Sequence, residues 1–329
     1  MRYRRLGRTG LEVSEVGFGC GGIGGLFVRG SPSEQREAVE AAVAGGVNYF
    51  DTAALYGDGQ SEQNLGRVLG ELGIEVLIGT KVNLAPGEVS SAETEISTKL
   101  AQGLRRLGRE RIDVCTFHGR IGAPGGPSTG AATADDVCGP IAAGLRRAVE
   151  AGLAGGIGFT GLGDTAAIHR VIASGAFDYA QCYLNVLNPS AARPGTAPPG
   201  AQDFDGVIGH CAEAGMGVMA IRVLGAGAVG ASPSRHPLAG DPGGPLAGDG
   251  YASDLSRAVR LGSVSSQLGL ENAYELALRA ALAHPQVSTA LVGFSDRVQV
   301  EEALRWQSRG PLTDDELAHA IGGGDDQRG

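Results

Sequence analysis

The chain has 329 residues, of which 42% are hydrophobic, 19% charged and 5% aromatic, and its formal net charge is −9. This length allows one large α/β unit or two ordinary domains, each with a substantial core. The negative charge argues against a nucleic-acid partner, because binding a phosphate backbone requires a basic patch.

The N-terminus, the most apolar segment and the cysteines indicate where the protein is located. The N-terminal "MRYRRLGRTG" carries charges without an apolar region behind them, so it does not predict a signal peptide. The most apolar window, "GMGVMAIRVLGAGAVGA", contains Arg222 and is too short and glycine-rich to cross a bilayer. Five cysteines without a C-x-x-C pair indicate reduced thiols, not disulfides or a metal site. We expect a cytoplasmic protein with a small-molecule partner and no metal.

Short apolar runs alternate with longer amphipathic stretches along the whole chain. Runs without polar alternation are typical of parallel strands covered on both faces. Eight strands, each followed by a helix, predict an α/β fold, a (β/α)8 TIM barrel over residues 1–310. The eight predicted strands are 15–20, 47–52, 75–81, 112–118, 155–161, 179–185, 217–224 and 289–295.

The two ends and the first helices have their own local signals. A glycine-centred turn within residues 1–14 predicts a hairpin that closes the barrel floor. A capping box with proline at the first helical position, residues 31–34, predicts a helix start, and Ser90 with Glu93 predicts another. The tail 311–329 ends in "GGGDDQRG" and is predicted to be partly disordered.

One glycine motif offers an alternative fold. "GFGCGG" (17–22) matches the G-x-G-x-x-G fingerprint of dinucleotide-binding Rossmann domains and follows a strand. The last glycine of that fingerprint should open a helix, yet the next helix signal comes only near Ser31. Asp51, the only strand-end acid, comes too late in the chain for the ribose role. The Rossmann alternative is therefore disfavoured.

Four polar residues stand at the ends of consecutive predicted strands or just beyond them: Asp51, Tyr56, Lys81 and His118. A barrel brings such strand ends together on its C-terminal face. A phenol near pKa 10 is a poor acid or base at neutral pH, but a nearby ammonium lowers its pKa, and a carboxylate keeps the ammonium charged. His118 can donate a hydrogen bond to a substrate oxygen. No side chain carries hydride, so this cluster predicts a nicotinamide cofactor.

These segments resemble the aldo-keto reductase family. "GVNYFDTAALYGDGQSEQNLGRVL", "LIGTKV" and "IDVCTFH" look like its aspartate–tyrosine, lysine and histidine segments, and the likeness runs from "RRLGRTGLEVSEVGFG" to "LVGFSDRVQVEEAL". The resemblance implies that Asp51, Tyr56, Lys81 and His118 form its catalytic tetrad.

The resemblance also implies a set of cofactor positions. Thr160 and Gln181 would face the carboxamide, Ile221 would form an apolar wall where the family usually stacks an aromatic ring, and Arg222 would hold the pyrophosphate. Gly293 and Gln299 replace the family's phosphate-binding lysine and arginine, so the choice between NADP(H) and NAD(H) stays open. The full set is Gly19, Cys20, Gly21, Asp51, Thr160, Gln181, Ile221, Arg222, Leu224, Gly227, Gly293, Ser295, Arg297, Gln299 and Glu302.

The expected function is a reversible oxidoreductase that interconverts a carbonyl and an alcohol. The cofactor-side segments are similar to the branch containing L-galactose and threo-aldose dehydrogenases. The alternative is a nicotinamide-binding regulatory protein on the same fold without useful turnover.

Three long, glycine- and proline-rich connections follow predicted strands, at 119–134, 186–202 and 229–252. In a barrel they rise from the C-terminal face, where such enzymes keep their chemistry. Few contacts are expected to hold 229–252, so it is predicted to be mobile in the free protein and ordered by nicotinamide binding.

Overall fold

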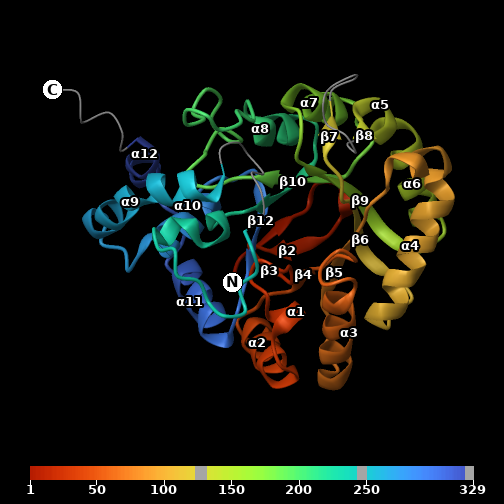
Figure 1. Ribbon diagram of the computed structural model, residues 1–329, viewed down its shortest axis with the longest axis horizontal. Coiled ribbons are helices and arrows are strands. Elements are labelled where there is room, and N and C mark those ends of the chain that lie inside the picture. The colour runs from red at the N-terminus through yellow and green to blue at the C-terminus, as the bar shows by residue number, and fades with distance from the viewer. Residues whose placement is uncertain (123–131, 243–249, 323–329) are drawn as a thin grey trace.

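Eight parallel strands close into a barrel in the computed structural model, which describes residues 1–122, 132–242 and 250–322 (Figure 1). Their order around the barrel is β10-β11-β12-β3-β4-β5-β6-β9. Each of the eight predicted apolar runs overlaps one of these strands, so the predicted (β/α)8 barrel is confirmed. The strands are β3 (Val16–Gly19), β4 (Tyr49–Asp51), β5 (Leu77–Val82), β6 (Ile112–Phe117), β9 (Ala154–Gly161), β10 (Tyr179–Tyr183), β11 (Gly217–Ile221) and β12 (Val287–Gly293).

Helices follow the strands and surround the barrel (Figure 1). A closed parallel barrel excludes the open doubly wound sheet that the glycine motif at 17–22 offered. The longer helices are α2 (Pro32–Ala44), α3 (Gln60–Leu72), α4 (Ala92–Leu107), α6 (Ala142–Glu150), α7 (Thr165–Ala173), α8 (Val207–Glu213), α9 (Tyr251–Gln267), α10 (Ala273–Leu282), α11 (Arg297–Ser308) and α12 (Asp314–Gly322). Shorter helical elements are η1 (Gly7–Thr9), α1 (Leu26–Arg29), η2 (Pro86–Ser91), α5 (Ala134–Asp136), η3 (Val137–Ile141) and η4 (Gly225–Gly230).

The predicted N-terminal hairpin is present and closes the floor of the barrel. Strands β1 (Tyr3–Arg5) and β2 (Glu12–Ser14) pair antiparallel. Leu6 and Val13 pack inside the barrel against Tyr49 and Tyr179, and all four side chains are fully buried. The floor is therefore a dry apolar plug, and the polar groups above it have access only from the C-terminal face.

Helix starts agree with the sequence in one case and differ in another. At α2, Ser31 Oγ accepts from the Glu34 amide at 3.3 Å, and Glu34 accepts from the Ser31 amide at 2.7 Å, as the capping box predicted. The helix predicted to start at Ser90 with Glu93 is present as α4, which begins at Ala92, but it has no side-chain cap. The Glu88 carboxylate instead accepts from the Ala85 amide at 2.7 Å, at the start of the 3-10 turn η2. That turn carries the chain into α4.

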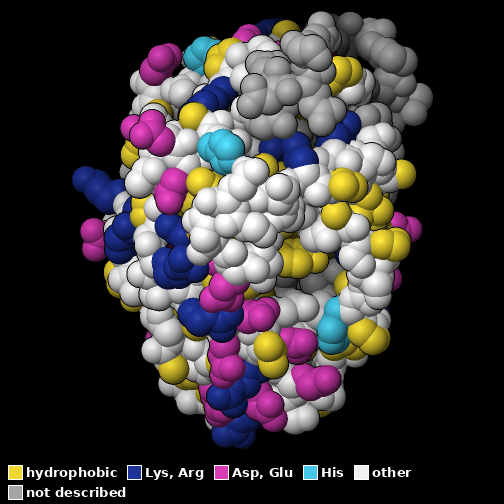
Figure 2. Space-filling model, turned by 90° about the vertical axis from the view of Figure 1, so that its left-hand side faces the viewer, with side chains coloured by type: hydrophobic (Ala, Val, Ile, Leu, Met, Phe, Trp, Pro, Cys, Tyr) yellow, Lys and Arg dark blue, Asp and Glu magenta, His cyan; other side chains and the backbone are white. Residues whose placement is uncertain are grey.

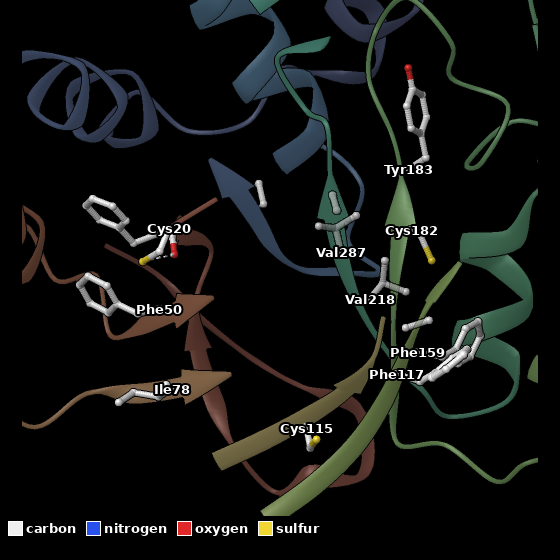
Figure 3. Packing of buried hydrophobic residues seen from close by; sticks show 14 of the residues in the cluster. Cys20, Phe50, Ile78, Cys115, Phe117, Phe159, Cys182, Tyr183, Val218 and Val287 are labelled. Carbon is white, nitrogen blue, oxygen red and sulfur yellow. Dashed lines mark hydrogen bonds between the residues drawn. The ribbon is translucent and has the colours of Figure 1, made fainter. Parts of the chain in front are cut away.

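Most of the core lies between the barrel and its helices. Phe117 and Phe159, register partners on β6 and β9, lie side by side there (Figure 3). Both rings are buried, and Phe159 packs edge-to-face on Phe177 with ring centroids 5.1 Å apart. The strands are apolar on both faces because one face lines the barrel and the other meets helices.

The predicted disordered tail contains a helix in its described part. Leu312 and Leu317 are buried in an apolar cluster with α9 and α10, and α12 begins at a capping box between Thr313 and Glu316. The packed region therefore extends past the expected boundary at residue 310. Residues 323–329 lie outside the described residues.

Two short strands occupy part of the first long connection. β7 (Ile121–Gly122) pairs with β8 (Ala132–Thr133), and the residues between them, 123–131, lie outside the described part of the chain. In the second connection, residues 186–191 are buried, so this segment belongs to the packed structure.

The face seen in Figure 2 interleaves acidic and basic side chains along its lower half. Several surface pairs sit one helical turn apart, such as Arg36 with Glu40 and Arg297 with Glu301. Across residues 1–122, 132–242 and 250–322, no helix has the length and apolar character needed to cross a bilayer.

Candidate active site

The barrel brings the four predicted polar residues to one point on its C-terminal face. Asp51 is the last residue of β4, Lys81 lies near the end of β5, and His118 follows β6 directly. These three strands are neighbours in the barrel. Tyr56 lies in the turn between β4 and α3, above the ends of the same strands.

Asp51 and Lys81 form a buried ion pair. Lys81 Nζ donates to Asp51 Oδ2 and, at 2.8 Å, to the Thr52 carbonyl oxygen. The side chains of Lys81 and Asp51 are 1% and 6% exposed. Burial alone would lower the pKa of Lys81, but the Asp51 carboxylate and the Tyr56 phenol outweigh it and raise the pKa above its ordinary value. The lysine is therefore a fixed ammonium.

Tyr56 lies between this ammonium and the histidine. Lys81 Nζ is 4.8 Å from the centroid of the Tyr56 ring, and the His118 ring meets it edge-to-face with centroids 5.8 Å apart. Burial raises the pKa of Tyr56, and Lys81 opposes this rise without cancelling it. The sequence analysis expected the lysine to lower this pKa; desolvation of the phenolate is the stronger effect, so Tyr56 is protonated at neutral pH.

His118 is a neutral imidazole. Its amide donates to the Val82 carbonyl oxygen at 2.7 Å, which fixes the backbone to the end of β5. Burial, together with the Lys81 charge, lowers the pKa of His118 to about 3. Its Nδ1 atom is buried and has no hydrogen-bond partner among the described residues.

The loop that carries Tyr56 is anchored by buried hydroxyl groups that the sequence analysis did not assign to the site. Ser61 Oγ donates to the Cys20 carbonyl oxygen at 2.8 Å and lies 2.8 Å from Thr52 Oγ1. Ser61 and Thr52 are both fully buried. The signal was local: Thr52 follows the strand-end aspartate, and Ser61 opens the next helix.

The second oxygen of Asp51 is also engaged. Gln181 Nε2 donates to Asp51 Oδ1 at 2.8 Å, and the Tyr49 hydroxyl group donates to the same oxygen at 3.4 Å. Gln181, predicted to face a carboxamide, thus reaches the tetrad itself. Tyr49 was not singled out, although the alternation of strand side chains puts it on the same side of β4 as Asp51.

Thr160 completes the polar surface beside Gln181. The two residues are register partners on β9 and β10. Thr160 is 3% exposed, and its Oγ1 has no partner within the described part of the protein. Buried polar atoms are normally satisfied, so Thr160 Oγ1 and His118 Nδ1 mark places where a ligand would bond. Ile221, predicted as an apolar wall, ends β11 next to Tyr183.

The turn after β11 has an unusual backbone. Arg222 and Ala226 have φ angles of 60° and 57°, values that non-glycine residues seldom adopt. Arg222 Nη1 donates to the Pro242 carbonyl oxygen at 3.1 Å. Leu224 precedes the 3-10 turn η4, and its carbonyl oxygen accepts from the Gly227 amide at 2.8 Å.

The described part of the third long connection, which follows β11, is tied to the segment after β3, two strands further around the barrel. The Gly240 amide donates to the Gly22 carbonyl oxygen at 3.0 Å, and Arg29 Nε donates to the Leu238 carbonyl oxygen at 2.8 Å. The expectation of few contacts in 229–252 is therefore wrong up to residue 242. Residues 243–249 lie outside the described residues, and ordering of this segment by nicotinamide stays a prediction.

The glycine-rich strand β3 leads to the same site. Gly19 pairs with Asp51 across β3 and β4, and the Cys20 amide donates to the Asp51 carbonyl oxygen at 2.8 Å. A methyl group added at Gly21 would lie 3.4 Å from the Tyr56 ring. This distance is an ordinary van der Waals contact, which places position 21 directly beside the Tyr56 ring.

Several of the predicted cofactor residues after β12 form hydrogen bonds or ion pairs within the protein. Ser295 Oγ donates to the Gly24 carbonyl oxygen at 2.6 Å, and its amide donates to Gln299 Oε1 at 2.8 Å. Arg297 pairs on the surface with Glu301, with 2.7 Å between Nε and Oε1. Gly293 is exposed, and Glu302 is half-buried on α11.

Asp296 has two partners at the start of α11. One oxygen caps the helix by accepting from the Gln299 amide at 2.9 Å, and the other lies 3.3 Å from His236 Nε2. Arg297, the basic residue that the sequence offers at this position, is paired with Glu301.

Comparison with known proteins gives the class to which this fold and site belong. The sequence model of the Aldo/keto reductase family matches residues 15–320. The chain therefore belongs to the aldo/keto reductase family of oxidoreductases.

Individual relatives are distant. L-galactose dehydrogenase of Arabidopsis thaliana is 25% identical over 92% of this chain and 86% of that protein. A probable voltage-gated potassium channel subunit beta of Oryza sativa subsp. japonica is 30% identical over 36% of this chain and 37% of that protein.

Two solved structures share the fold across nearly the whole chain. An aldo-keto reductase from Bacillus halodurans in its holo form has a TM-score of 0.72 at 22% identity, covering 97% of this chain and 95% of that one. An aldo/keto reductase from Klebsiella pneumoniae in complex with NADP and acetate has a TM-score of 0.68 at 17% identity, covering 97% and 93%.

Proposed function

We propose that the protein interconverts a carbonyl and an alcohol at Tyr56, with a nicotinamide cofactor bound at the C-terminal face of the barrel. The observation that carries this proposal is the cluster of Asp51, Lys81, Tyr56 and His118, in which a phenol lies between a fixed ammonium and a neutral imidazole.

Tyr56 is the proton donor in reduction and the base in oxidation. Its phenol is protonated at neutral pH, so it is ready to give a proton to the oxygen of a carbonyl substrate. Lys81, held by Asp51, stabilises the phenolate that forms when the proton leaves. Neutral His118 donates a hydrogen bond to the same substrate oxygen. In the oxidation direction, the Tyr56 phenolate accepts the proton of the alcohol, while Lys81 and His118 keep the same contacts.

A bound nicotinamide supplies or accepts the hydride, which no side chain of this chain can carry. Thr160 and Gln181 would hold its carboxamide, since Thr160 Oγ1 is buried without a partner among the described residues and the Gln181 side chain carries an amide oxygen that can accept. Ile221 would form the apolar wall, and Arg222 would neutralise the pyrophosphate. Gly19, Cys20 and Gly21, at the end of β3 and directly after it, would line the same cofactor site. Leu224, Gly227, Gly293, Ser295, Arg297, Gln299 and Glu302 remain predicted positions toward the rest of the cofactor.

A sugar is the substrate class that we favour. The relative with the longest match among the curated proteins named above is an L-galactose dehydrogenase, similar over 92% of this chain. Tyr56 and its neighbours act on a carbonyl or hydroxyl group, which is the chemistry at the anomeric carbon of a cyclic sugar. We expect a screen of aldoses, small aldehydes and ketones to find turnover among these compounds.

Replacing Tyr56 tests the proposal directly. Tyr56→Phe should bind nicotinamide like the unmodified protein and lose roughly 10²–10⁴-fold in turnover. The matched control is Tyr3→Phe, which removes a phenol oxygen from the exposed hairpin and should leave turnover unchanged. Near-normal turnover by Tyr56→Phe would rule out its assigned role.

The alternative function is a regulatory protein that binds nicotinamide without useful turnover. The partial match to a potassium channel subunit beta supports it over about a third of the chain, 36%. The complete tetrad supports catalysis instead. Tight nicotinamide binding with no oxidation or reduction of any compound in the screen would favour the regulatory function.

A further inference from the structure

Tyr49 has a hydroxyl group in a place where a hydroxyl group is costly. Its side chain is fully buried inside the barrel, among the apolar residues of the floor. A phenylalanine would fill the same space without removing a hydroxyl group from water, which costs free energy unless a partner is found. The space-filling role therefore does not explain the oxygen.

The neighbouring strand is also adapted to that oxygen. Gly79 on β5 is the register partner of Asp51, and a Cβ atom added at Gly79 would collide with the Tyr49 hydroxyl oxygen. Glycine inside a strand weakens the strand, because it has no side chain to pack. The barrel thus accepts a weak strand position and a buried hydroxyl group together.

The partner of the hydroxyl group is the tetrad carboxylate. The Tyr49 hydroxyl group donates to Asp51 Oδ1 at 3.4 Å, the oxygen that also accepts from Gln181 Nε2 at 2.8 Å. Asp51 Oδ2 receives Lys81 Nζ. Donors from β4, β5 and β10 therefore hold this carboxylate.

We propose that Tyr49 is a positioning residue of the active site: its hydroxyl group spreads the negative charge of Asp51 away from Tyr56 and fixes the carboxylate under Lys81. The inference rests on the proposed function of Tyr56 as the proton-transfer residue. Gly79, which has no side chain, leaves the space that the Tyr49 hydroxyl group occupies. A phenol that donates to a carboxylate draws charge onto itself, so less charge is left to oppose the phenolate of Tyr56.

A second interior tyrosine supplies a matched control. Tyr179 on β10 is also fully buried in the floor, but its hydroxyl group lies 2.6 Å from Thr116 Oγ1 and makes no hydrogen bond to Asp51. Tyr49→Phe and Tyr179→Phe each remove one buried phenol oxygen. Only the first removes a donor to the tetrad.

The measurement is the ionisation of Tyr56 itself. Ultraviolet difference titration of each protein against the same protein carrying Tyr56→Phe isolates the Tyr56 phenolate from the other tyrosines. We expect Tyr49→Phe to raise the apparent pKa of Tyr56 by about half a unit to one unit, and Tyr179→Phe to leave it unchanged. In the oxidation direction, kcat/KM below that pKa should fall by about 3- to 10-fold in Tyr49→Phe, with the pH profile displaced to higher pH.

The outcomes separate this proposal from the function on which it rests. An unshifted titration in Tyr49→Phe, or an equal shift in Tyr179→Phe, would overturn the positioning role. Absence of turnover in the unmodified protein would count against the proposed function, while the titration would still report the coupling. If Tyr49→Phe unfolds more readily, Gly79→Ala provides a second test: its methyl group should displace the hydroxyl group and raise the Tyr56 pKa, and combining it with Tyr49→Phe should add no further rise. A further rise in the double variant would contradict the proposal.

Discussion

Gln181 on β10 and Asp51 on β4 lie 130 residues apart in the chain, yet the side-chain amide of the first donates a 2.8 Å hydrogen bond to a carboxylate oxygen of the second. The bond crosses the interior of the barrel from one strand end to another. It links the residue expected to face the cofactor with the tetrad expected to move the proton. A substitution at either position should therefore alter the hydrogen bonding of the other.

Gln181→Leu tests this link. Loss of a hydrogen bond to a buried carboxylate should lower the free energy of unfolding by about 1.5–3 kcal/mol, and nicotinamide binding should weaken as well. Gln307→Leu is the control. Gln307 is buried and donates at 2.5 Å to Glu15, which directly precedes β3 at the N-terminal end of the barrel, away from the tetrad. Denaturant unfolding and nicotinamide titration should find both variants destabilised and only Gln181→Leu impaired in binding. Equal nicotinamide affinity in the two variants would contradict the link.

The buried ion pair should be costly to break from one side. Lys81→Met leaves the Asp51 carboxylate buried without its cation, which is expected to cost about 3–5 kcal/mol in the free energy of unfolding. Adding Asp51→Asn removes the stranded charge and should restore most of that loss. Denaturant unfolding of the two single variants and the double variant measures the coupling. Additive losses would show that the pair does not act as a unit.

The strands, and the meeting of Asp51, Tyr56, Lys81 and His118 at one end of the barrel, were predictable because their signals are local. Parallel barrel strands are uniformly apolar, and Asp51, Lys81 and His118 each come where such a run ends. The helix α12 was missed because the glycine-rich end of the tail dominated its composition, although Thr313 and Glu316 form a capping box.

Other features arise only when the barrel closes. Nothing in the sequence around Gln181 indicates that its amide bonds to Asp51, because the contact depends on the register of β4, β9 and β10. Leu238 and Gly240 are tied to the segment after β3 through their own main-chain atoms, which any residue type supplies. The pKa of Tyr56 rises instead of falling because burial, a property of the whole fold, outweighs one neighbouring charge.

Ser61 should prove important although it does not touch the reacting groups. Ser61→Ala removes the hydroxyl group that joins Thr52 to the Cys20 carbonyl oxygen under the Tyr56 loop. Leaving the buried Cys20 carbonyl oxygen and the buried Thr52 hydroxyl group without this partner should cost about 1–3 kcal/mol and lower turnover by loosening the loop. The comparison variant is Ser266→Ala, whose exposed hydroxyl group bonds within α9 at 3.1 Å to Gly262. Thermal unfolding and turnover should distinguish the two, and equal effects would remove Ser61 from the support of the site.

We expect the residues at the start of α11 to favour NADH over NADPH. Asp296 carries a negative charge there, Arg297 is paired with Glu301, and Gly293 and Gln299 replace the basic clamp of the family. We expect NADH to bind at least about tenfold more tightly, which corresponds to about 1.4 kcal/mol. Asp296→Ser keeps a helix-capping oxygen while removing the charge, so it should reduce the difference between the NADH and NADPH affinities. Fluorescence titration with both cofactors measures it, and tighter NADPH binding by the unmodified protein would refute the preference.

His118 should make the protein sensitive to acid. Its pKa is lowered to about 3 in the folded protein, from an ordinary value of 6.5 that the unfolded chain recovers. Between these two values the unfolded chain binds the extra proton, so the free energy of unfolding should be fully present above about pH 6.5 and fall as the pH drops toward 3. His118→Gln cannot take up that proton, and its unfolding free energy should depend less steeply on pH within this window. His284, whose pKa burial lowers to about 4, should contribute in the same direction, whereas exposed His319 serves as the control. Denaturant unfolding at several pH values in His118→Gln, His284→Gln and His319→Gln makes the comparison. If His118→Gln retains the full slope of the unmodified protein, the imidazole is not held neutral by the fold, and its role as a neutral hydrogen-bond donor fails with it.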